Sequence, residues 1–168
     1  MDADAEFEQY VADSFARLCR TGFLLCGDWQ RAEDAAQETL LKMHRSWSRI
    51  SRHKGLDAYA RQTLVHTLID EWRRPWRRRE RVSDMLLDTS PAPVDATRQV
   101  DDRAQLVRAV ARLAPRQRAC VVLRFYLDSS VADTAATLGC SEGNVKRLTS
   151  DGLAALRAAL ETTEGSLT

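Results

Sequence analysis

Glycine and proline are scarce in this chain, with seven and four copies among 168 residues. These two residues interrupt helices and supply most tight turns, and alternating β-branched residues, the usual mark of strands, are nearly absent as well. The sequence therefore excludes a β-rich architecture and predicts an all-α fold. We expect two small helical domains joined by a flexible linker.

Long apolar runs are also missing. No stretch approaches the length of a transmembrane helix, and the acidic N-terminus, Met1–Glu6, lacks the basic-then-apolar order of a signal peptide. We therefore expect a cytoplasmic protein that does not insert into a membrane.

The four cysteines, Cys19, Cys26, Cys120 and Cys140, fall at no metal-ligand spacing, and only three histidines accompany them. We interpret them as reduced, mostly buried side chains, with a zinc or redox role as the lesser alternative.

No catalytic set can be assembled either. The chain lacks a glycine-rich phosphate loop, paired metal-binding histidines and a nucleophile elbow. A carboxylate metal site at Glu33, Asp34 and Glu38 would need Glu-x-x-His partners, which His44 and His66 do not supply. We expect no enzyme activity, cofactor or metal, and we interpret the carboxylates as a solvated or partner-binding face.

Net charge is only +1, but it is distributed unevenly. Residues 1–41 carry −6, residues 42–81 carry +8, residues 82–102 carry −4 and residues 103–168 carry +3. Because attraction to phosphate acts within a Debye length of about 8–10 Å, the block of +8 matters whatever the total.

Helical periodicity organises the front of the chain. It predicts a first helix from Phe7 toward Leu25, a second after an N-cap at Asp28, and a third from near Asp57. A basic loop is expected over residues 48–55, and Pro75 predicts a boundary near Arg74. The predicted inward stripes are Ala32, Ala36, Leu40, Met43 and Trp47 on the second helix, and Leu64, Val65, Leu68 and Trp72 on the third.

The periodicity fades and acids accumulate over residues 81–102, which include Ser90-Pro91-Ala92-Pro93. This segment is the expected linker between a front domain, 1–80, and a rear domain, 103–168. In the rear domain Leu106, Val110 and Leu113 indicate one helix, and Pro115 opens another through Tyr126.

Residues 131–150 have the pattern of a helix-turn-helix. Ala135 is small where the helices must cross, Gly139 suits a left-handed helix end, and Val145 supplies an apolar anchor. Ser141 is placed to cap the second helix, which is expected to continue past Ser150. Since the second helix of such a motif enters the major groove, candidate readers are Glu142, Asn144, Lys146 and Arg147; an ordinary helical hairpin is the alternative.

Residues 45–81 interleave cations with aromatic side chains, a combination that suits separated DNA strands because cations follow the phosphates and aromatic faces accept unstacked bases. For Trp47 and Trp72, which fall on apolar stripes, a core position is favoured. For Trp76, a core position and a base-stacking role are balanced.

Two groups of motifs resemble the extracytoplasmic-function sigma factors. Gly27-Asp28, Ala32-Glu33-Asp34-Ala35-Ala36-Gln37-Glu38-Thr39 and residues 57–65 are similar to their region 2. Leu113-Ala114-Pro115-Arg116-Gln117-Arg118, Leu123-Arg124-Phe125-Tyr126 and residues 138–146 are similar to their region 4. The resemblance covers nearly the whole chain.

The resemblance implies a subunit that gives RNA polymerase its promoter specificity. Core polymerase and promoter DNA are the implied partners, and an anti-sigma factor is left open as a third. The implied polymerase contacts are Asp34, Gln37, Glu38 and Leu41. Candidate contacts to the melted −10 strand are Arg49, Arg52, His53, Lys54, Tyr59, Arg61, Gln62, His66, Arg73 and Arg74. Candidate contacts to the −35 duplex are Glu142, Asn144, Lys146, Arg147 and Ser150.

The chain also departs from the family pattern. Thr134 replaces a usual apolar residue, Leu148 a polar or basic one, and Asp151 a frequent arginine, while His66 stands for a common asparagine. An acid near phosphates opposes binding, so a weaker or shifted grip on the −35 element is expected.

Two other classes of protein stay open from sequence. A stand-alone helix-turn-helix regulator would bind duplex DNA without polymerase, and a helical adaptor would bind proteins only.

Overall fold

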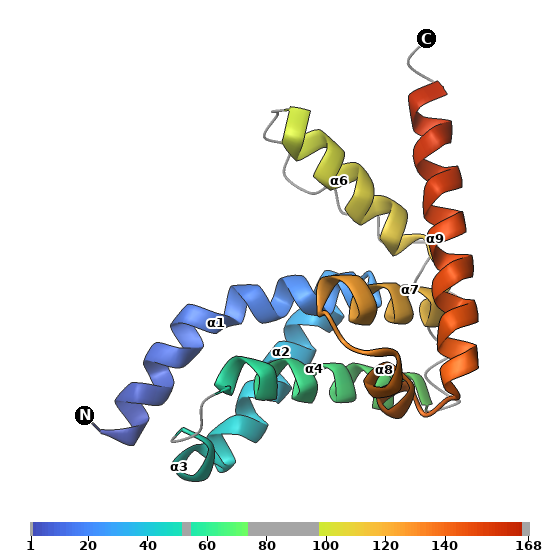
Figure 1. Ribbon diagram of the computed structural model, residues 1–168. Helices are drawn as coiled ribbons and strands as arrows, with labels where there is room; N and C mark the ends of the chain where they lie inside the picture. Colours follow the sequence, from blue (N-terminus) through green and yellow to red (C-terminus); the bar gives the residue numbers. More distant parts are fainter. Residues whose placement is uncertain (1, 52–54, 74–97, 166–168) are drawn as a thin grey trace. The chain divides into compact units, whose positions relative to one another are not determined.

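The computed structural model describes residues 2–51, 55–73 and 98–165, and every regular element in these ranges is helical (Figure 1). The all-α prediction is therefore confirmed. The chain divides into two compact units, Met1–Leu87 and Asp88–Thr168. No helix in the described ranges is long and apolar enough to cross a membrane.

The first unit consists of α1 (Ala3–Cys26), α2 (Trp29–Arg45), the short α3 (Trp47–Ile50) and α4 (Leu56–Arg73). Gly27 ends α1 in the left-handed region, with φ of 73°, and its N–H donates to the Phe23 carbonyl oxygen over 2.7 Å. The Asp28 carboxylate accepts from the Arg31 N–H over 3.2 Å, so the predicted cap of α2 is confirmed. This two-residue turn lets α1 and α2 pack side by side.

The core of the first unit is formed by α1, α2 and α4, which all pack against one another. The five predicted stripe residues of the second helix are all buried, as are Leu64, Val65 and Leu68 of α4. A Cβ on Gly22 would lie 3.1 Å from the Cβ of Ala32, which shows how closely α1 and α2 approach. The side chain of Trp72, with Pro75 and Trp76, lies outside the described residues.

The predicted extent of the second helix is wrong. α2 ends at Arg45, Ser46 leaves helical geometry with φ of −113° and ψ of 7°, and Trp47 begins α3. The predicted loop therefore starts later, because residues 47–50 form a helical turn that buries Trp47 and Ile50. Periodicity alone did not reveal the break at Ser46, because Trp47 is buried, as it would be if α2 continued through it.

The second unit consists of α6 (Arg98–Ala111), α7 (Pro115–Val121), the π-helical turn η1 (Val122–Tyr126), α8 (Val131–Leu138) and α9 (Glu142–Gly165). The long α9 is its spine, and α6, α7 and α8 all pack on it (Figure 1). The close approach of α7 needs a glycine in α9, because a Cβ on Gly152 would lie only 2.8 Å from Cγ2 of Val121.

Three details of the rear domain differ from expectation. α6 begins at Arg98, so residues 98–102 are helical rather than part of the expected linker, of which residues 81–97 lie outside the described ranges. Leu106 is 45% exposed instead of buried. The helix expected from Pro115 through Tyr126 ends in a π turn, in which the Leu127 N–H reaches the Val122 carbonyl over 3.0 Å.

Candidate nucleic-acid and partner interfaces

The exposed face of α2 brings four predicted partner residues together. Asp34, Gln37, Glu38 and Leu41 are all exposed, and their spacing places them on one side of the helix, opposite the buried stripe. Leu41 is 62% exposed although it is a large apolar side chain. An exposed leucine among carboxylates has the composition of a protein-binding surface, with an apolar centre and a charged rim.

Local contacts preorganise these carboxylates. The Gln30 side-chain amide donates to Asp34 Oδ1 over 3.1 Å, and Lys42 Nζ lies 3.0 Å from Glu38 Oε1. Both pairs are four residues apart on α2, so each carboxylate is held along the helix.

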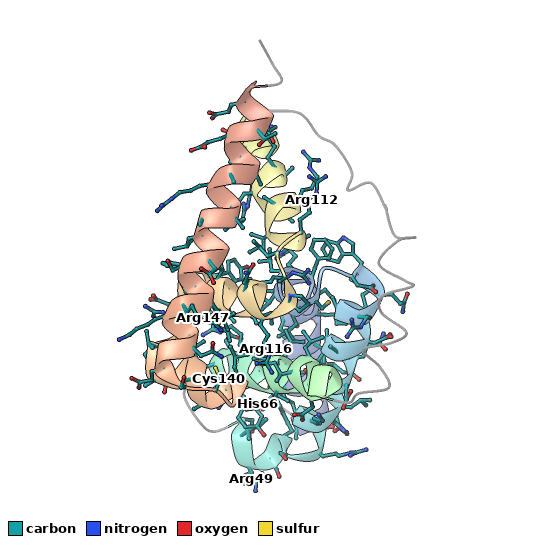
Figure 2. The ribbon with its side chains drawn as sticks, turned by 90° about the vertical axis from the view of Figure 1, so that its right-hand side faces the viewer. Arg49, His66, Arg112, Arg116, Cys140 and Arg147 are labelled. Atoms are coloured by element: carbon teal, nitrogen blue, oxygen red, sulfur yellow. The ribbon has the colours of Figure 1, made fainter. Side chains whose placement is uncertain are left out.

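The predicted strand-binding residues are only partly described. Arg49 is exposed on α3 and His66 is exposed on α4 (Figure 2). Tyr59 and Gln62 are exposed on the same side of α4 as His66. Arg61 is also exposed, but it lies two positions from Tyr59 and therefore on a different side of the helix. The side chain of Arg73, and all of Arg52, His53, Lys54 and Arg74, lie outside the described residues.

A polar network that sequence reasoning missed joins α1 to the start of α4. The Tyr10 hydroxyl lies 3.2 Å from Asp57 Oδ1, and Arg17 Nη2 lies 2.9 Å from the same oxygen. Burial, followed by the Asp57 carboxylate, raises the pKa of Tyr10 to about 12, so this phenol keeps its proton. In the sequence Tyr10 belongs to an apolar stripe, and no signal indicated a partner 47 positions away.

The helix-turn-helix geometry is present in the second unit. Ser130 caps α8 by accepting from the Asp133 N–H over 3.0 Å, Gly139 ends it with φ of 66°, and Ser141 accepts from the Asn144 N–H over 3.1 Å at the start of α9. Val145 is 0% exposed. The predicted roles of Gly139, Ser141 and Val145 are confirmed.

A small core holds the two helices of the motif together. Its buried members are Cys120, Ala135 and Val145. Leu148 and Cys140 pack against them, so Leu148 faces the core, which accounts for an apolar residue at that position. Thr134 is fully buried as well.

The first turns of α9 present the candidate base readers. Glu142, Lys146, Arg147 and Ser150 are exposed, and Arg147 lies on α9 beyond Cys140 of the motif's turn (Figure 2). Asn144 is half-buried, and its Oδ1 accepts from Arg147 Nη2 over 2.7 Å. Asn144 and Arg147, both candidate readers, are therefore paired in the unbound chain.

The thiols match the expectation of reduced, mostly buried side chains. Cys19, Cys26 and Cys120 are buried, Cys140 is half-buried, and none is in a disulfide. Burial, with a smaller contribution from Cys140, raises the pKa of Cys120 to about 11 and so disfavours its reactive thiolate. No group of three or more histidine, cysteine or carboxylate side chains in the described residues could hold a metal ion.

Comparisons with known proteins agree with the two units. Sigma-70 region 2 matches residues 5–78, and Sigma-70, region 4 matches residues 103–156. The RNA polymerase sigma-E factor of Streptomyces coelicolor is 39% identical over 92% of this chain and 86% of its own length. The ECF RNA polymerase sigma factor SigL of Mycobacterium tuberculosis is 32% identical over 95% of this chain and 92% of its own.

A solved structure supports the fold. The sigma factor RpoE of Bartonella quintana, crystallised in complex with the anti-sigma factor NepR, matches with a TM-score of 0.67 at 24% identity, over 93% of this chain and 97% of that one. With regions 2 and 4 in order and relatives matched over most of their length, the chain belongs to the extracytoplasmic-function family of RNA polymerase sigma factors.

Proposed function

We propose that the chain, as a sigma factor, divides promoter recognition between its two units. The exposed face of α2 binds core polymerase through Asp34, Gln37, Glu38 and Leu41. The connection between α3 and α4, with the exposed side chains of α4, Arg61 among them, captures the separated −10 strand, and α9 reads the −35 duplex. Polymerase carries out the chemistry, and the sigma factor works beside it in the cytoplasm.

The observation that carries this proposal is the different composition of two exposed surfaces on the first unit. The exposed side of α2 is acidic with an apolar centre, whereas α3 and α4 expose Arg49, Tyr59 and Gln62. The first composition suits a protein and repels DNA, while cations and aromatic rings suit an opened strand. Capture of flipped bases would offset the unstacking cost of a few kcal/mol.

The helix-turn-helix supports the duplex-reading role. Lys146 and Arg147 are exposed next to the capped N-terminus of α9, where cations and helix N–H groups can meet phosphates and base edges. The exposed Asp151 opposes phosphate binding one turn further along α9. Replacing it with asparagine is therefore expected to strengthen −35 binding.

Run-off transcription with purified core polymerase and a genomic promoter library tests the proposal. New start sites that depend on this chain are expected. A chain that protects duplex DNA without polymerase and yields no start sites would instead be a stand-alone regulator, and one that never binds DNA would be an adaptor.

Paired variants test the division of labour. Arg61→Ala is expected to impair promoter opening more than polymerase binding, whereas Asp34→Ala combined with Glu38→Ala is expected to do the reverse. Equal loss of both steps in both variants would contradict the assignment.

A further inference from the structure

Tyr10 of α1 contacts both flanks of the connection between α3 and α4. On the α3 side its ring centroid lies 5.5 Å from that of Trp47. On the α4 side its hydroxyl lies 3.2 Å from Asp57 Oδ1 and 3.4 Å from the Leu56 carbonyl oxygen. A phenol has one proton to donate, so these two acceptors share it. One side chain thus links the first residue of α3 to the start of α4.

Arg17 strengthens the contact on the α4 side. It follows Tyr10 by seven residues, two turns along α1, so both side chains point the same way. Its Nη2 lies 2.9 Å from the same carboxylate oxygen of Asp57. Asp57 is in the first turn of α4, where the helix dipole favours a negative charge.

The Arg17–Asp57 ion pair is better suited to orienting the start of α4 than to stabilising the fold. The side chains of Arg17 and Asp57 are 51% and 52% exposed, and an ion pair this exposed contributes little to the free energy of unfolding. Its geometry is nevertheless directional, because one carboxylate oxygen accepts from two donors that are both fixed on α1.

Other contacts position α4 as well. Its buried residues Ala60 and Leu64 pack in the core of the first unit, and the Tyr59 N–H donates to the Gly55 carbonyl oxygen over 3.0 Å. Tyr10 and Arg17 add side-chain contacts to the first turn of α4, ahead of that core.

We propose that Tyr10 and Arg17 are positioning residues for strand capture. By holding Asp57 from α1, they fix the first turn of α4, and with it the exposed side chain of Tyr59, before DNA arrives. The entropic cost of ordering this surface is then met during folding rather than during promoter opening. The inference rests on the proposed function.

The test uses the full chain with core polymerase and a duplex promoter recovered by run-off selection, labelled with 2-aminopurine in the −10 element. Tyr10→Phe removes only the hydroxyl and keeps the ring beside Trp47, and Arg17→Gln removes the charge. Each is expected to lower the equilibrium constant for opening roughly two- to tenfold, the range of one lost hydrogen bond. Affinity for core polymerase is expected to stay unchanged, and the unfolding temperature to fall by no more than the few degrees that one hydrogen bond contributes.

Gln9→Ala is the matched control, because its 3.1 Å bond to Asp13 stays within α1. It is expected to open the promoter like the unaltered chain. A shared network also predicts non-additivity. Because the contact of Arg17 is with Asp57, adding Arg17→Gln to Asp57→Ala should cause no further loss of opening.

The outcomes separate this inference from the proposed function. If the unaltered chain opens the promoter and the Tyr10 and Arg17 variants open it equally well, the positioning role is overturned. Parallel losses of polymerase affinity, unfolding temperature and opening would overturn it too, because they would show a merely structural role. If the unaltered chain fails to open any promoter, the proposed function itself falls, and the inference with it.

Discussion

The buried Arg118 of α7 provides the sharpest test of how the second unit is held together. It is only 3% exposed, and its guanidinium donates to three backbone carbonyl oxygens: Val110 at 3.2 Å, Ala111 at 2.7 Å and Leu113 at 3.0 Å. The usual helical donor for Ala111 would be residue 115, but that residue is a proline and has no N–H. Arg118 replaces it, and its positive charge is favourable at the C-terminus of α6.

The expected cost of losing Arg118 follows from these bonds. Arg118→Ala leaves the oxygens of Ala111 and Leu113 without this donor, at about 1–3 kcal/mol each. Part of that cost is offset because a buried guanidinium no longer has to be desolvated. We expect a net loss of roughly 2–4 kcal/mol, a large share of the 5–15 kcal/mol typical of a domain. Arg118→Lys keeps the charge but not the planar fork, so an intermediate loss is expected.

The distribution of tryptophan makes the assay specific. All four tryptophans precede residue 87, and among them Trp47 is buried in the first unit, so tryptophan fluorescence reports the unfolding of the first unit. Far-ultraviolet circular dichroism reports the helices of both units. In Arg118→Ala, the ellipticity transition of the second unit should move down by about 10 °C or more, while the fluorescence transition stays in place.

Arg116→Ala is the matched control, because Arg116 is exposed two residues earlier on α7 (Figure 2). Substitutions at such surface positions typically change stability by less than about 0.5 kcal/mol. If Arg118→Ala melts like Arg116→Ala, the three carbonyl contacts do not stabilise the second unit and the reasoning is refuted.

Three further predictions concern packing and titration. Gly152→Ala should lower the stability of the second unit by about 1–3 kcal/mol in chemical denaturation, because the added Cβ would meet Val121 at 2.8 Å. Gly143→Ala, whose Cβ would meet no described atom within 4 Å, should not destabilise it. Equal stabilities of the two variants would contradict the close approach of α7 to α9. Cys120, fully buried with its pKa raised to about 11, should resist maleimide at pH 8 until the protein is unfolded, and prompt labelling of Cys120 in the native chain would count against this core. Because folding raises the pKa of Tyr10 from 10.0 to about 12, the stability that Tyr10 contributes is fully present below pH 10 and is lost between pH 10 and 12. Tyr10→Phe should remove that loss, together with the phenolate absorbance step near pH 12. An unchanged titration curve would show that Tyr10 does not titrate there.

Local signals in the sequence predicted much of both units. The cap at Asp28, the left-handed end at Gly139 and the cap at Ser141 depend on the chemistry of one residue and its nearest neighbours along the chain. The two faces of α2 follow from helical periodicity alone, so the exposed acidic side and the buried stripe were both predictable.

Features that depend on distant contacts were not predictable. The pairing of Tyr10 with Asp57 spans 47 positions, and the burial of Arg118 depends on where α6 ends. Nothing in the composition of these residues distinguishes them from an ordinary stripe tyrosine or a surface arginine.

By itself, then, the sequence determined the helical class, the position of the caps, the faces of the helices and the family, because each of these depends on residues within a few turns of one another. Only the tertiary structure decided which polar groups meet. The hydroxyl of Tyr10, the carboxylate of Asp57 and the guanidinium of Arg118 have many possible partners in an extended chain. Packing selects one set, because it brings α1 beside the start of α4 and buries Arg118 against the end of α6.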